Sequence, residues 1–134
     1  MSETLNHGAV LIVEEEPAVQ VILDAILRKN GFRTLRARSG KEAAEIAERH
    51  FVPIDVILTN IEVEGDSGPD LVEKLRQIRQ NLQVVYISAT VADGAVQIKL
   101  MRQLGPDYFI TAGDAGIVNA VRNAMAVSTL RAGA

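Results

Sequence analysis

Short apolar runs alternate along this chain with longer segments whose apolar residues recur every three or four positions. The runs are rich in β-branched residues and too short for ordinary helices, so they predict strands, whereas the periodic segments predict amphipathic helices. Five such repeats predict an α/β protein, a parallel sheet with helices on both faces. The expected strands span 9–13, 32–37, 55–59, 83–87 and 107–111.

Turn and capping residues mark where the expected helices begin and end. Pro17 suits the first position of a helix, where its missing N–H costs nothing, and Gly31 can adopt the left-handed conformation that ends one. Ser39 is a suitable N-cap for a helix that begins near Gly40. The expected inner face of the first helix consists of Val19, Ile22, Leu23, Ile26 and Leu27.

Length and charge restrict the domain organisation and the class of partner. The 134 residues suit one domain at 8–127, with flexible tails at 1–7 and 128–134. A net charge of -3 and a pI near 5.4 argue against nucleic-acid and acidic-membrane surfaces. Because the chain has no cysteine, no signal-peptide pattern and no membrane-spanning apolar run, we expect a soluble cytoplasmic protein.

The run at 55–59 ends in polar residues and indicates where the chemistry of the chain should lie. Open parallel sheets bind ligands at the carboxyl ends of their strands, and Asn60 stands at such an end. An amide can donate and accept hydrogen bonds, but it lacks the charge that lets a carboxylate act as a nucleophile or hold a cation. Glu14 and Glu15 follow the first strand and Ser88 follows the fourth, so we expect them at the same edge.

The order and separation of three segments resemble the receiver domain of two-component response regulators. These segments are 13–17, 57–61 and 86–88, and the similarity extends from about residue 9 to residue 126. The resemblance implies a flavodoxin-like (βα)5 fold, a doubly wound parallel sheet of order 2-1-3-4-5 in three layers. In that family an acidic pair binds magnesium, an aspartate accepts a phosphoryl group from a histidine kinase, a hydroxyl and a lysine contact the phosphate, and an aromatic residue reports the change to partners.

The resemblance assigns the pocket positions one by one, and the reactive ones depart from the family pattern. The acidic pair becomes Glu14 and Glu15, each a methylene longer than an aspartate. Asn60 stands at the position of the acceptor aspartate and Ala112 at that of the lysine, while Ser88 provides the hydroxyl. Three carboxylates with one lysine carry a charge of about -2, as do two glutamates with a neutral amide and alanine. This balance favours a naturally degenerate pocket.

The departures predict a protein that transfers no phosphoryl group and is not an enzyme. The amide nitrogen of Asn60 is delocalised and is not a competent nucleophile, so an acyl phosphate is excluded there. Ala112 cannot neutralise a transferring phosphoryl group. Glu14 and Glu15 could bind Mg²⁺ or Ca²⁺ weakly, although acidic residues also suit a solvated helix N-terminus without any ligand.

Two further pocket positions allow both a functional and a structural interpretation. Ser88 either takes part in a conformational switch or caps the loop before the next helix. Phe109 takes the position of the family's reporting aromatic residue, and it either flips between two positions or belongs to the core.

The sequence therefore favours a stand-alone pseudo-receiver, a phosphorylation-independent interaction module in two-component phosphorelay signalling. Relatives bind partners through the fourth helix, fifth strand and fifth helix, which makes Lys99, Arg102, Tyr108 and Arg122 the candidate contacts. The expected partner is a histidine kinase or another component of a response regulator pathway, and a homodimer stays open.

Two other functions remain as alternatives. One is a receiver that responds to a cation through Glu14 and Glu15. The other is a small-ligand binder on a flavodoxin-like scaffold. Nucleotide and flavin binders need a glycine-rich or hydroxyl-rich loop after the first strand. The acidic loop at 14–17 would instead repel phosphate, which disfavours the second alternative.

Overall fold

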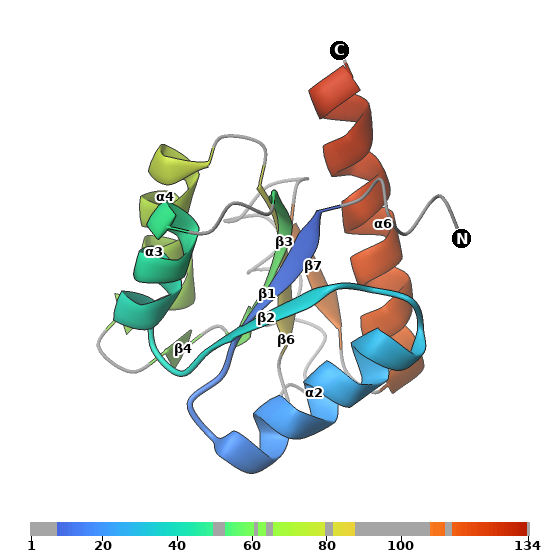
Figure 1. Ribbon diagram of the computed structural model, residues 1–134, viewed down its shortest axis with the longest axis horizontal. Helices are drawn as coiled ribbons and strands as arrows, with labels where there is room; N and C mark the ends of the chain where they lie inside the picture. The colour runs from blue at the N-terminus through green and yellow to red at the C-terminus, as the bar shows by residue number, and fades with distance from the viewer. Residues whose placement is uncertain are drawn as a thin grey trace, which may run out of the picture.

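Apolar strands that are buried on both faces form the centre of the structure (Figure 1). The computed structural model describes residues 8–49, 53–60, 62–63, 66–79, 82–87, 108–111 and 114–133. The strands of the main sheet are β1 (Ala9–Val13), β2 (Thr34–Ala37), β3 (Ile54–Asn60), β6 (Gln83–Ile87) and β7 (Tyr108–Thr111). They are all parallel and have the order β2-β1-β3-β6-β7, which confirms the predicted order 2-1-3-4-5.

Helices cover both faces of this sheet, as the alternating pattern predicts. They are α2 (Pro17–Lys29), α3 (Gly40–Arg49), α4 (Gly68–Ile78) and α6 (Asp114–Gly133). In Figure 1, α2 and α6 lie on one face and α3 and α4 on the other. Successive strand residues alternate between the two cores. Val10, Ile12, Val56 and Leu58 pack beneath α2 and α6, whereas Leu11, Val13 and Ile57 pack beneath α3 and α4.

The predicted helix boundaries are confirmed in the first half of the chain. Pro17 occupies the first turn of α2, and Gly31 ends the helix with a φ of 88°. The amides of Gly31 and Phe32 donate to carbonyl oxygens of the last helical turn, over 3.1 Å each, in a Schellman arrangement. At the start of α3, the Oγ of Ser39 accepts a hydrogen bond of 3.2 Å from the amide of Glu42, so Ser39 is the N-cap.

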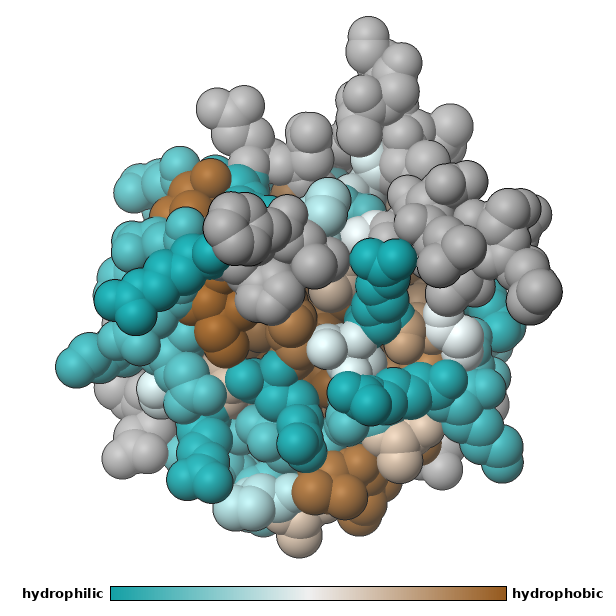
Figure 2. Space-filling model, viewed as in Figure 1, coloured by the Kyte–Doolittle hydropathy of each residue, from teal (hydrophilic) through white to brown (hydrophobic). Residues whose placement is uncertain are grey.

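The orientation of α2 differs from the predicted one. Leu23 and Leu27 are buried as expected, but Val19 and Ile22 are 36% and 57% exposed, and Gln20 is buried in their place. Figure 2 shows apolar surface at the lower edge of the view, where α2 lies in Figure 1. The prediction was wrong because apolar residues occur on the outer side of this helix as well as on its inner side, so that spacing alone does not define one inner face.

The other departures concern segments around the second half of the sheet. A two-stranded antiparallel hairpin, β4 (Glu62–Val63) with β5 (Asp66–Ser67), precedes α4 and was not predicted. The last helix runs to Gly133, and Ser128 is 1% exposed, so the tail expected from 128 onward is wrong as far as 133. The helix that the alternating pattern predicts between the strands at 83–87 and 107–111 lies outside the described residues. In the part of the chain that the structure describes, none of the helices has the combination of length and apolar content that a membrane-spanning segment needs.

The cap at Gly31 provides a direct test of the backbone argument. Replacing Gly31 with alanine places a Cβ on a left-handed residue, so we expect the free energy of unfolding to fall by about 1 kcal/mol. Gly31→Asn is the matched control, because asparagine tolerates this conformation better, and it should lose less. Urea denaturation measures both variants, and equal losses would contradict the argument.

Gln83 is an exception in an otherwise apolar strand. It is completely buried, and neither its amide nitrogen nor its amide oxygen has a hydrogen-bond partner in the part of the chain that the structure describes. An unpaired buried amide costs about 1–3 kcal/mol. We therefore expect Gln83→Met, which keeps the length and removes the amide, to raise the melting temperature. Gln83→Ala also removes the amide but leaves a cavity, and it should lower the melting temperature. Calorimetry distinguishes the two, and a destabilised Met variant would show that the amide is satisfied.

Candidate functional site

The register of the central strands brings the predicted site positions to one edge of the sheet. Val13 pairs with Thr59, so Glu14 and Asn60 each stand one residue beyond a paired position. Asn60 in turn pairs with Ile87, the residue before Ser88. The backbones that carry Glu14 and Asn60 are therefore neighbours, as predicted. The side chain of Asn60, and all of Ser88 and Ala112, lie outside the described residues.

The two glutamates of the expected acidic pair have different surroundings. Glu14 is only 6% exposed, and its amide donates a hydrogen bond of 2.9 Å to the carbonyl oxygen of Ala37 in the neighbouring strand β2. Its Oε1 accepts a long contact of 3.4 Å from the amide of Glu16, so the carboxylate turns back over its own loop. Glu15 is exposed. The pair therefore combines one buried carboxylate with one in solvent.

Gln20 is the residue at this edge that the sequence analysis missed. It is 8% exposed, and its Nε2 donates to the carbonyl oxygen of Glu14 over 3.2 Å and to that of Ala37 over 3.1 Å. One side chain of α2 thus joins the ends of β1 and β2. The only sequence signal is its spacing, because Gln20 shares a helix face with Leu23 and Leu27, three and seven residues later.

The described side chains do not form a cation site. In the described ranges, no three acidic, histidine or cysteine side chains come together as metal ligands. The Oε1 of Glu14 already faces a backbone amide, and magnesium requires close octahedral geometry from oxygen ligands. The described side chains alone therefore do not supply the ligand set for magnesium, which the resemblance implies.

The remaining predicted residues are placed only in part. Tyr108 and Phe109 belong to β7, where Phe109 pairs with Val85, but their side chains lie outside the described ones. Arg122 is exposed on α6. Lys99 and Arg102 lie outside the described residues, so the structure does not test the proposed interaction face.

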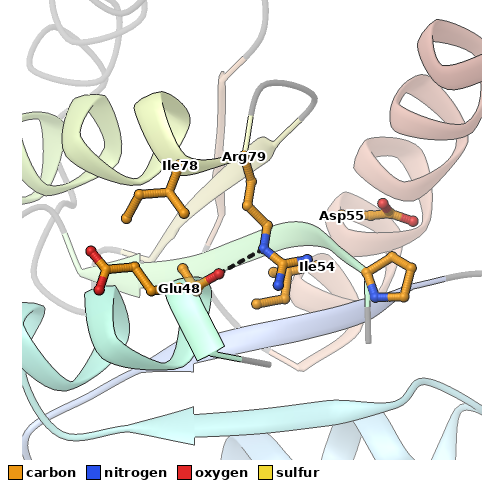
Figure 3. Close-up of a pocket in the computed structure, with 7 residues that line it drawn as sticks. Glu48, Ile54, Asp55, Ile78 and Arg79 are labelled. Carbon is orange, nitrogen blue, oxygen red and sulfur yellow. Dashed lines mark hydrogen bonds between the residues drawn. The ribbon is translucent and has the colours of Figure 1, made fainter. Parts of the chain in front are cut away.

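A hollow of about 480 Å³ lies at the opposite edge of the sheet and does not belong to this site. Figure 3 shows Ile54 and Asp55 at the start of β3, whereas Asn60 stands at its end. Across the hollow, the Nε of Arg79, the residue after α4, donates a hydrogen bond of 2.9 Å to the carbonyl oxygen of Ala47 and so ties the end of α4 to α3. The contact joins two helices and forms part of the scaffold.

The order of the sheet and its polar carboxyl edge define a doubly wound, flavodoxin-like α/β protein. Residues 10–112 match the family model of the response regulator receiver domain, and the chain belongs to this family. The protein therefore contains a receiver domain of two-component signalling.

Known proteins support the same assignment. The chain is 24% identical over 85 residues to sporulation initiation phosphotransferase F of Bacillus subtilis, across 63% of this chain and 67% of that protein. It is 30% identical over 88 residues to the sensor kinase CckA of Brucella abortus, across 66% of this chain but only 9% of that protein. The solved structure of a response regulator receiver domain protein from Clostridium thermocellum covers 92% of this chain and 98% of its own, with a TM-score of 0.76 and 21% identity. This last similarity supports the fold alone.

The contacts of Gln20 lead to a prediction about the loop that carries the glutamates. Gln20→Leu keeps the burial but removes both hydrogen bonds, so we expect the free energy of unfolding to fall by about 1–3 kcal/mol. Amide exchange at Glu15 and Glu16 should also become faster. Glu45→Leu replaces an exposed polar residue on α3 and should change stability by less than about 0.5 kcal/mol. Urea denaturation and hydrogen exchange by NMR measure these effects, and an unchanged loop would show that Gln20 is dispensable.

Proposed function

We propose that this receiver domain is a pseudo-receiver, a protein-interaction module of phosphorelay signalling that works without being phosphorylated. The observation that carries the proposal is the residue at position 60. The strand register places this position at the carboxyl edge, beside the end of β1 and opposite Ile87 of β6. The sequence has asparagine there.

The chemistry of the edge supports this proposal. A phosphoryl acceptor must be a nucleophile, and an amide nitrogen is not one because its lone pair is delocalised. Ala112 supplies no cation for the transferring group. Glu14 is buried and turned toward its own loop, which disfavours the alternative of a cation-responsive receiver. The exposed carboxylate of Glu15 would repel a nucleotide phosphate, which disfavours a small-ligand binder.

The partner in this proposal is a histidine kinase or another component of a response regulator pathway, in the cytoplasm. The names of the relatives, a phosphotransferase and a sensor kinase, fit such a pathway. The proposed interaction face contains Lys99, Arg102, Tyr108 and Arg122. Of these, Arg122 is exposed in the part of the chain that the structure describes.

Intact mass spectrometry after incubation with acetyl phosphate and magnesium tests the proposal. We expect no phosphoryl adduct on the natural sequence, because residue 60 has no nucleophilic oxygen. The matched variant combines Asn60→Asp and Ala112→Lys with Glu14→Asp and Glu15→Asp, so it restores the acceptor, the lysine and the shorter acidic pair that the resemblance implies. An adduct on that variant shows that the assay detects acceptors at this edge. A stoichiometric, alkali-labile adduct on the natural sequence would overturn the proposal.

A further inference from the structure

The outward side of α2 is apolar over most of its length. Val21 and Ile22 are 55% and 57% exposed, and Ala18 and Ala25 are also exposed. Their spacing of three, four and seven residues places them on one stripe, opposite the buried face of the helix. Of the four large hydrophobic residues exposed in the described ranges, three lie on α2. Single exposed apolar residues are ordinary, but a continuous stripe indicates an interaction surface.

Charged residues stand at both ends of this stripe, and their signs are opposite. Glu15 and Glu16 are exposed just before the helix, and Arg28 and Lys29 are exposed in its last turn. A second copy of α2 that runs antiparallel would therefore place acidic residues against basic ones at both ends. A parallel copy would place like charges together, which is unfavourable.

The residue spacing also fits a two-fold axis. If the axis passes between Val21 and Ile22, Val21 of each copy contacts Ile22 of the other copy. Ala18 then faces Ala25, because the two are equally distant from the axis, and the loop with Glu15 and Glu16 comes to the end of the second helix that carries Arg28 and Lys29. The small alanines allow the two helices to approach closely.

We infer that α2 associates with α2 of a second copy of this chain, antiparallel across this two-fold axis. A helix of 13 residues is about 20 Å long, so this contact is smaller than the interface of about 800 Å² per partner in stable complexes. The dimer is accordingly weak and concentration-dependent. It does not require a reactive residue at position 60, and it brings Arg28 of the second copy beside the acidic loop that contains Glu15.

Introduced cysteines test the orientation, because the chain has no natural cysteine. Positions 18 and 25 are about 10 Å apart along the helix, which exceeds the Cα separation of about 7 Å that a disulfide can span. A mixture of Ala18→Cys and Ala25→Cys should form crosslinked heterodimers under mild oxidation, whereas either variant alone should form few. Ala126→Cys, which is exposed on α6, is the matched control and should not crosslink with either.

Sedimentation equilibrium between about 10 μM and 1 mM tests the energetics. The natural sequence should show a monomer–dimer equilibrium, and Ile22→Glu should weaken it at least about tenfold. Ala126→Glu should leave it unchanged.

Charge reversal tests the proposed antiparallel orientation. The dimer should be weakened by Lys29→Glu, and also by Glu15→Lys together with Glu16→Lys. A variant that combines all three substitutions should restore it. The inference would be overturned by a monomer throughout this range, or by crosslinking of each α2 cysteine variant with itself. The stripe would then bind a helix of another protein instead of a second copy.

Discussion

Burial of the central strands from both sides is the constraint on which the rest of the structure depends. All five residues of β1 are at most 1% exposed, and Val56, Ile57 and Leu58 of β3 are completely buried. Removing a large aliphatic side chain from water contributes about 1.5–3 kcal/mol, so both faces of the sheet must be covered. Strands joined through covering helices run parallel, and parallel strands bring their carboxyl ends to one edge. This edge holds the backbones of Glu14 and Asn60 together.

The edge is held by contacts to main-chain groups. Gln20 binds the carbonyl oxygens of Glu14 and Ala37, and the amide of Glu14 binds the same oxygen of Ala37. These contacts require no charged group at position 60 or 112. The loop after β1 can therefore keep its shape when the reactive residues of the family change. Such a scaffold is consistent with a receiver domain that recognises partners without accepting a phosphoryl group.

The two sides of helix α2 have different roles, one structural and one at the surface. Gln20, Leu23 and Leu27 face the sheet and support its edge. Val21 and Ile22 face solvent and carry the inferred pairing surface. Substitutions on the outer side can change association without disturbing the contacts of Gln20, since the two sets of residues do not share a face.

The sequence by itself determined the type and order of the described main-sheet strands and helices, and also the caps. Pro17, Gly31 and Ser39 act within about one turn of their own position, so local chemistry was sufficient to predict them. The resemblance of three short segments correctly implied the order of the sheet, and in that order the backbones of Glu14 and Asn60 are neighbours. Only the tertiary structure decided which side of α2 is buried, because its apolar residues lie on more than one side and packing against the sheet selects among them. The role of Gln20 was equally unpredictable, since its two acceptors lie on strands that become neighbours only after long-range pairing.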